Sequence, residues 1–420
     1  MRRLRALVAV TLIAVSWTSA PGQTYRNFRD ELDEIMTRAK LRIGPLRLLP
    51  KLQLQNLGYD DNVYFRNPEE GPVGDYTGSL SPEIRAYLLL GRSLILSFTE
   101  NPEYLYFAKE THLRTFTNSY APRIRLNLFN RFTLSGDYRF QKHLRRAFSE
   151  FSDLVSDTTK GNTTSFFYET PRGSSIGLSV VIDRFSYEDI VLPDREVLFS
   201  RSLNRKESTG NVEVYYPIFS ESTFFAKVGS TRYEFDHPSS LWKNSRSVQA
   251  SAGLRFPFMG RARGTISVGY KRFIPDSKER KIFSGLVADT DVDFRLGRFG
   301  LRFGLGRDNH FSYLEDVLYY VEDRVSSGLS FRLTRRFRLD YDIKYGALKY
   351  PEPFQVYAPG VGSLETARRD VHRTHSIGFA VRILRTTGIQ LSYNIFERTS
   401  NVPGSDRKRN FFGLGLTQDF

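Results

Sequence analysis

The sequence has no cysteine among its 420 residues, so disulfides contribute nothing to the stability of the fold. No run of about 18 consecutive apolar residues follows the amino-terminal segment, which excludes a protein that crosses a membrane with helices. Tryptophan and methionine are scarce, at 2 and 3 residues, whereas tyrosine and phenylalanine supply 23 and 34. This aromatic composition favours strands over helices.

The first residues, MRRLRALVAVTLIAVSWTSAPGQ, have the three parts of a secretory signal peptide. Three arginines open the chain, an apolar stretch runs from Ala6 to Val15, and small residues follow at Ser19 and Ala20. The apolar stretch is too short to span a membrane. We therefore predict a signal peptide over residues 1–22 and an exported mature protein; an uncleaved anchor is the alternative.

Acidic residues are fewer than basic ones, 46 against 61, and the formal net charge is +15. Such a charge is typical of nucleic-acid-binding proteins, but an exported protein seldom meets nucleic acid. We therefore expect no nucleic-acid partner. An anionic polysaccharide, the phosphates of lipopolysaccharide or an acidic solute would satisfy the same charge.

Only residues 24–41, TYRNFRDELDEIMTRAKL, have a convincing helical period. Phe28, Leu32, Ile35 and Met36 recur at helical spacing, and acidic residues come early while basic residues come late, as the helix dipole favours. We predict that residues 23–44 form a short helical segment in the periplasm, or a partial plug.

Beyond this segment the apolar residues alternate with a period of two. The stretches FRLDYDIKY (337–345), FTLSGDYRF (132–140) and IQLSYNI (389–395) each have one apolar and one polar face. The mean hydropathy of −0.39 fits a membrane barrel, because half of its strand residues face a wet lumen. The period predicts an all-β fold.

Short and long connections alternate between these strands, which is typical of an outer-membrane barrel with brief periplasmic turns and long outer loops. Residues 150–162 and 351–369 are two of the predicted long loops. We predict a transmembrane antiparallel β-barrel over residues 45–420, with about 18 strands. Sixteen is the alternative count, because the strand 163–170 is short and the first strand contains Pro50.

The last strand, FFGLGLTQDF, places four apolar residues on one face: Phe412, Leu414, Leu416 and Phe420. It resembles the carboxy-terminal assembly signal of bacterial outer-membrane proteins, which implies recognition by the barrel-assembly machinery. LGYDDNVYF (57–65), NRFTLSGDYRF (130–140) and DRFSYED (183–189) resemble the Gram-negative putative beta-barrel porins associated with exopolysaccharide export. That resemblance implies a barrel of the bacterial outer membrane and carries over no catalytic or binding residues.

If lipid covers the apolar face, the opposite face lines the lumen. The inward arginines near short turns would form a basic belt at the periplasmic mouth: Arg125, Arg255, Arg295, Arg302, Arg332, Arg338 and Arg382. Inward acidic residues lie farther up: Asp137, Asp289, Asp291, Asp293, Asp340 and Asp342. In one interpretation these charges pair across strands and fill a wet interior; in the other, uncompensated arginines attract anions.

Signals for catalysis are weak. The six histidines are scattered without metal-ligand spacing, and no nucleophile motif is present, so we expect no enzyme activity, cofactor or structural metal. We expect a passive conduit or assembly component for anionic solutes or exported polysaccharide, in contact with outer-membrane lipid and lipopolysaccharide. A plugged structural or adhesive barrel and an outer-membrane hydrolase are the alternatives.

Overall fold

The computed structural model describes residues 27–146, 149–151, 153–191, 196–219, 222–259, 261–358 and 362–420. The predicted signal peptide lies outside the described residues, as do residues 23–26 of the predicted helical segment. No helix in the described ranges is long and apolar enough to cross a membrane.

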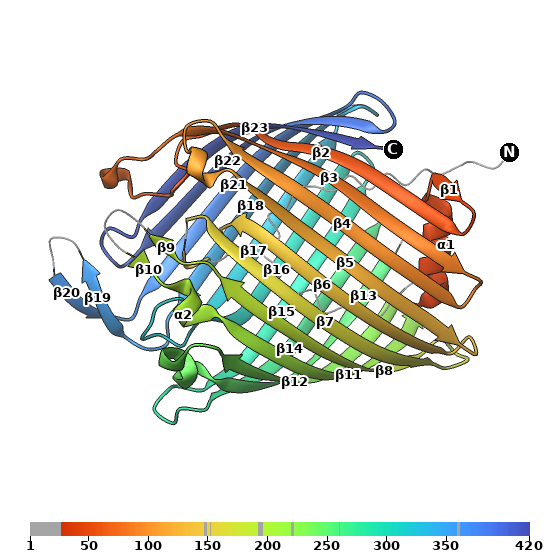
Figure 1. Ribbon diagram of the computed structural model, residues 1–420, viewed down its shortest axis with the longest axis horizontal. Helices are drawn as coiled ribbons and strands as arrows, with labels where there is room; N and C mark the ends of the chain where they lie inside the picture. Colours follow the sequence, from red (N-terminus) through yellow and green to blue (C-terminus); the bar gives the residue numbers. More distant parts are fainter. Residues whose placement is uncertain are drawn as a thin grey trace.

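Eighteen long antiparallel strands form a closed cylinder (Figure 1). The cylinder closes because β2 pairs with β3 on one side and with the last strand, β23, on the other. The strands are β2 (Leu46–Asp60), β3 (Asp75–Leu90), β4 (Leu94–Phe107), β5 (Thr115–Leu128), β6 (Phe132–Arg145), β7 (Val155–Glu169), β8 (Ser175–Tyr187), β11 (Arg205–Phe219), β12 (Ser222–Phe235), β13 (Ser245–Met259), β14 (Ala262–Pro275), β15 (Phe283–Leu296), β16 (Phe299–Phe311), β17 (Tyr319–Arg332), β18 (Phe337–Lys349), β21 (Arg369–Arg382), β22 (Thr387–Ser400) and β23 (Arg407–Asp419).

The predicted count of 18 strands is confirmed, and the alternative of 16 is wrong. The largest error is at β7, where residues 155–162 belong to the strand and not to a loop. The outward positions Thr158, Lys160 and Asn162 are polar, as are inward Asp157 and Thr159. Because both faces are polar, the sequence shows no alternation of hydropathy there. Cross-strand pairing with β6 and β8 forms the strand instead.

The two ends of the barrel differ in their connections. The tight turns and the chain end lie at one end, which we assign to the periplasm; Gly297, with φ of +62°, makes one such turn. The long loops lie at the other, extracellular end (Figure 1). They contain the small elements η1 (Pro68–Glu70), η2 (Thr111–Leu113), β9 (Ile190–Val191), β10 (Glu196–Val197), α2 (Phe199–Leu203), η3 (Pro238–Lys243), β19 (Phe354–Ala358) and β20 (Gly362–Thr366).

The outer face of the wall is apolar and the inner face is polar, the reverse of a water-soluble protein. On β8, Leu178 and Val180 point outward and are 56% and 54% exposed, whereas inward Ser179 and Asp183 are 9% and 7% exposed. Apolar side chains recur in this way at every second residue of most strands. Lipid in contact with this face would remove the exposed apolar surface from water.

A buried ion pair joins the first and last strands at the seam of the cylinder. Arg409 of β23 donates from Nε and Nη2 to the Asp60 carboxylate of β2 at 2.8 and 2.6 Å. The Asp60 side chain is 4% exposed, and the Arg409 guanidinium also lies over the rings of Phe65 and Phe411. The pair therefore adds side-chain contacts to the backbone ladder where the barrel closes.

We predict that Arg409→Gln destabilises the barrel, because it leaves a buried carboxylate without its main partner, a loss of about 3–5 kcal/mol. The temperature at which the compact form is lost in detergent gel electrophoresis should fall. Lys408→Gln is the matched control, since Lys408 makes an exposed pair with Glu397 at 3.2 Å. Equal midpoints for the two variants would contradict a role for the seam pair.

Candidate functional site

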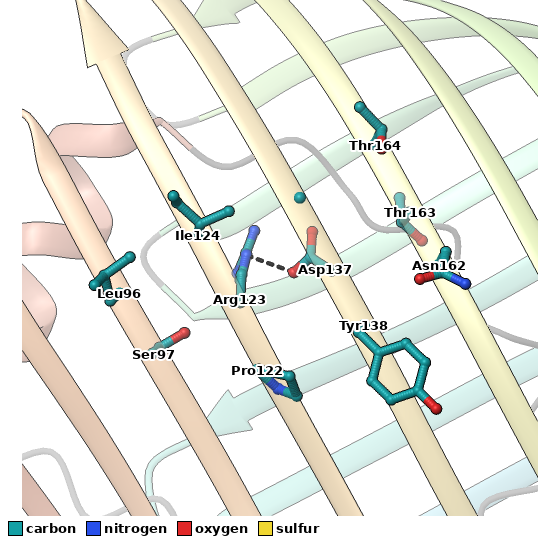
Figure 2. Close-up of a pocket in the computed structure, with 11 residues that line it drawn as sticks. Leu96, Ser97, Pro122, Arg123, Ile124, Asp137, Tyr138, Asn162, Thr163 and Thr164 are labelled. Carbon is teal, nitrogen blue, oxygen red and sulfur yellow. Dashed lines mark ion pairs between the residues drawn. The ribbon is translucent and has the colours of Figure 1, made fainter.

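The inner wall carries ion pairs between neighbouring strands. Arg123 of β5 contacts Asp137 of β6 at 2.7 Å, and Figure 2 shows the two side chains joined across the strands. Lys227 of β12 and Glu213 of β11 form another such pair at 3.3 Å. Two further pairs reach across an intervening strand: Arg139 of β6 with Asp183 of β8, and Lys271 of β14 with Asp308 of β16, both at 2.8 Å. Pairing offsets the desolvation of charges that the wall largely buries.

The seven arginines of the predicted basic belt occupy inward positions, each within four residues of the periplasmic end of its strand. Six lie on one sector of the wall, between β13 and β21, and Arg125 lies on β5. The belt is therefore a sector and not a complete ring. Carboxylates hold three of its members: Arg125 by Glu31, Arg302 by Asp293 and Asp342 at 3.2 and 3.5 Å, and Arg338 by Asp340 at 2.8 Å.

Two arginines of the belt differ from these. Within the described residues, no carboxylate lies within ion-pair distance of Arg332 or Arg382; Arg332 Nη2 donates instead to the Gly297 carbonyl at 2.9 Å. Arg332 is also in register with Arg338 on the adjacent strand. Like charges directly opposite each other are destabilising unless an anion or solvent screens them.

The six inward aspartates are only partly neutralised. Asp137, Asp293, Asp340 and Asp342 pair with arginines. Asp289 and Asp291 lie opposite Gly306 and Gly304, and no cationic side chain in the described part of the chain is within ion-pair distance of either. No group of three or more His, Cys, Asp or Glu residues among those described could hold a metal ion.

Helix α1 (Phe28–Arg38) lies inside the barrel near its periplasmic mouth. Phe28 and Ile35 pack against Leu89 and Ile95, which are inward residues of β3 and β4. Asn27 caps the helix with its side chain and also donates to both carboxylate oxygens of Glu169, at 2.9 Å.

The Glu31 carboxylate of α1 reaches Arg125 and, at 3.5 Å, Arg123. The helix is therefore held to the wall by apolar packing and by charge. The prediction of a helix in this segment is confirmed, and its position in the lumen narrows the mouth.

Two hollows lie on opposite sides of the wall of β4–β7. The larger, about 480 Å³, is lined largely by outward side chains such as Pro122, Ile124 and Tyr138, so it faces lipid and cannot be part of a conduit (Figure 2). The smaller, about 250 Å³, lies between Glu31 of α1 and inward residues including Arg123 and Arg139. The inner hollow is the space that α1 leaves open beside the wall.

The β6–β7 loop reaches the opposite wall at the extracellular end. Glu150 accepts hydrogen bonds from Ser312 Oγ at 2.6 Å, Tyr350 Oη at 2.8 Å and the Tyr313 backbone N–H at 2.9 Å. The Ser149 hydroxyl donates to Glu322 of β17 at 2.6 Å.

The pairing order of the strands places β17 and β18 nine strands from β6 and β7 in a ring of eighteen. The loop therefore crosses the barrel mouth. We call the contacts of Ser149 and Glu150 the latch.

A buried lysine supports the latch from the neighbouring loops. Lys243 Nζ donates to the carbonyl oxygens of Ser312 and Leu314, both at 3.0 Å, and its residue is fully buried. Burial lowers the pKa of Lys243 to about 7, while the nearby Glu150 carboxylate opposes the shift. Burial also raises the pKa of Glu150. Lys243 and Glu150 thus both hold residues 312–314, the segment that follows β16.

The latch was not predicted from the sequence, because loop residues have no period that indicates where they point. One signal was available: Phe151 is an aromatic residue in a polar loop. It is 4% exposed and packs against Phe199 and Tyr313, with ring centroids 4.8 and 5.2 Å away. An aromatic residue in an outer loop therefore indicated a loop that folds into the barrel.

We predict that Glu150→Ala opens the extracellular mouth, because three buried donors lose their acceptor at about 1–3 kcal/mol each. Single-channel recordings in planar bilayers should show a larger conductance or a higher open probability. Glu188→Ala, which removes an exposed carboxylate paired with Lys142 at 3.1 Å, should conduct like the wild type. Unchanged conductance in a correctly folded Glu150→Ala barrel would show that the loop does not obstruct the lumen.

The stability of the packed extracellular loops should depend on pH because of Lys243. Its folded pKa is about 7 and its ordinary value is 10.5, so between these values the released loops bind more protons than the packed ones. The packed state therefore gains stability as the pH rises from 7 to 10. We expect the open probability of the wild type to fall over this range relative to Lys243→Met. Parallel pH profiles for the two proteins would contradict the assignment.

With this geometry described, the chain can be compared with known proteins. The family model described as putative beta-barrel porin 2 matches residues 40–420. No curated protein matches the chain in sequence. Among solved structures, OccK9 (OpdG) and OccK11 (OpdR) of Pseudomonas aeruginosa are similar in fold, each with 12% identity over 89% of this chain, covering 98% and 96% of theirs, with TM-scores of 0.51 and 0.50.

The FrpB iron transporter from Neisseria meningitidis shares 8% identity over 88% of this chain, with a TM-score of 0.47, and the chain spans 63% of its length. At these identities the likeness to solved structures concerns the fold alone. The family match covers the whole described barrel. The chain therefore belongs to the putative beta-barrel porin 2 family and is a porin-like β-barrel of the bacterial outer membrane.

Proposed function

We propose that the barrel is a passive conduit for anionic solutes or for an exported anionic polysaccharide. The observation that supports this most is the pair Arg332 and Arg382, which face the lumen at the periplasmic mouth without a carboxylate partner in the described ranges. Arginines that line a pore bias it toward anions. The paired arginines of the belt contribute less, since their carboxylates cancel most of their charge.

The conduit has a restriction at each end. At the periplasmic mouth, α1 occupies the wall of β3–β5 and leaves the sector of Arg332 and Arg382 uncovered by its described contacts. At the extracellular mouth, the latch crosses the lumen. An anion would enter beside the basic sector and leave once the latch loop moves. The latch therefore sets the conductance, and the basic sector sets the selectivity.

A solute and a polysaccharide would use the same chemistry. Carboxylate or phosphate groups accept hydrogen bonds from guanidinium groups, and Arg332, in register with the Asp340-paired Arg338 on the adjacent strand, offers such a site. A polymer needs a continuous path, so its passage requires displacement of the latch. A small anion needs only a gap beside it.

We predict that Arg332→Gln combined with Arg382→Gln lowers the preference for anions, by about two- to fivefold in permeability ratio, since one unit charge in water is worth about 1 kcal/mol at close range. Reversal potentials across a salt gradient measure this ratio.

Lys349→Gln combined with Lys408→Gln is the control for this test. It removes the same charge from outward positions near the extracellular end. An unchanged permeability ratio in the variant with Arg332→Gln and Arg382→Gln would show that the basic belt does not determine selectivity.

A plugged structural barrel is the second candidate, and α1 together with the latch supports it. The same recordings separate the two functions. A conduit conducts in the wild-type state, whereas a plugged barrel conducts only after the latch or residues 24–41 are removed. No conductance from either of those variants would contradict both candidates.

A further inference from the structure

A second group of basic residues lies on the outside of the barrel, away from the lumen. Seven consecutive strands of the wall, from β6 to β14, each carry one outward basic side chain within five residues of the extracellular end of the strand. At about 3.3 Å per residue, each therefore lies within roughly 17 Å of the extracellular end of its own strand. We call this group the outer basic band: Lys142, Lys160, Arg184, Lys206, Arg232, Arg246 and Arg272.

The members of this band face each other across the strands. Lys160, Arg184 and Lys206 are in direct register on β7, β8 and β11, and Arg232 is in register with Arg246 on β12 and β13. Directly opposed like charges destabilise a sheet. This arrangement is therefore unfavourable unless an anion is present to bridge the cations.

The carboxylates of the chain compensate the band only in part. Lys142, Arg184, Lys206 and Arg232 each have one exposed carboxylate, at distances of 3.1, 3.4, 3.9 and 2.7 Å. Such exposed pairs are worth at most about 1 kcal/mol, so a stronger anion can replace them. Within the described chain, no carboxylate is within ion-pair distance of Lys160, Arg246 or Arg272, and all three are exposed.

Apolar side chains lie below the band, toward the middle of the membrane, and on some strands they follow the cation directly. On β8, Ile182 follows Arg184 on the outward face and is itself followed by Val180 and Leu178. On β14, Tyr270 and Val268 follow Arg272 in the same way. These two strands therefore offer a cation above and an acyl-chain surface directly below. On β7 and β11 the apolar outward residues begin farther from the cation, at Phe166 and Val212.

The neighbouring sector of the wall has a different chemistry at the same height. On β2–β5 the outward residues near the extracellular end are aromatic: Tyr59, Tyr76, Tyr104, Tyr106 and Phe116. A general requirement of the membrane boundary would act on both sectors alike. The band differs from β2–β5 and from the separate outward cations on β16, β18 and β23 in that its cations are continuous over seven adjacent strands.

We propose that the outer basic band binds the phosphate groups of an outer-leaflet glycolipid, the phosphorylated lipid A part of lipopolysaccharide. Phosphates accept charge-assisted hydrogen bonds from Arg and Lys, and the register of the band places two or three cations around one anion. The acyl chains of the same molecule would cover the apolar residues below. A phosphate and its hydrocarbon then meet complementary surfaces on one strand.

Binding of rough lipopolysaccharide to the full-length barrel, purified from outer membranes and stripped of lipid in detergent, tests this proposal. The variant combines Lys160→Gln, Arg246→Gln and Arg272→Gln, the three cations without a carboxylate. We expect its affinity to fall by about tenfold or more, because each cation near an anionic lipid surface contributes separately. Phosphatase-treated lipopolysaccharide should bind the wild type as weakly as the intact lipid binds the variant.

The matched control combines Arg307→Gln, Lys349→Gln and Lys408→Gln. It removes three outward cations that each have a carboxylate, at 2.7, 2.8 and 3.2 Å, from the other side of the barrel. We expect its affinity to stay within about threefold of the wild type. Both variants should keep the compact form in detergent gel electrophoresis.

Equal affinity of the band variant and the wild type would overturn the proposal, as would equal binding of phosphorylated and phosphatase-treated lipid. Complete displacement of the lipid by inorganic phosphate would also overturn it, because a free anion would then be the ligand. The conductance of the band variant should equal that of the wild type, so this test is independent of the lumen.

Discussion

The fold depends on one constraint: inside a bilayer, every backbone N–H and C=O must find its partner within the protein. A sheet meets this constraint only when its last strand pairs with its first, as β23 does with β2. Closure then divides every strand into a lipid face and a water face. The two-residue period along the chain, the apolar exterior and the charged interior are consequences of that single requirement.

Charges placed inside a closed wall cannot leave, so their mutual arrangement determines the properties of the lumen. Several inward cations lie beside a carboxylate of the inner wall, and Glu31 of α1 is shared by two arginines. What remains is a small excess of positive charge on one sector of the wall at the periplasmic mouth. The electrostatics of this interior therefore depend on a few residues that lack partners, and the total charge of the chain is a poor guide to them.

The extracellular loops provide a second means of controlling passage through the barrel. Ser149 donates to Glu322 of the far wall, and Glu150 accepts from Ser312 and from the Tyr313 backbone. Lys243 fixes the segment that supplies these two donors. A wall that cannot change its diameter can still be closed by a loop that moves. The outer surface adds a third level, because cations above apolar residues match the two parts of a glycolipid.

The sequence by itself determined the barrel, its eighteen strands and the facing of most side chains, because strand period and turn spacing are local properties. It failed at residues 155–162, where both faces are polar and only pairing with β6 and β8 defines the strand. It also identified the inward arginines without indicating which have partners. Only the tertiary structure decided that Glu31 neutralises Arg125, that the β6–β7 loop spans the mouth, and that Lys160, Arg184 and Lys206 meet in register. These contacts join residues distant in the chain, and no local pattern records them.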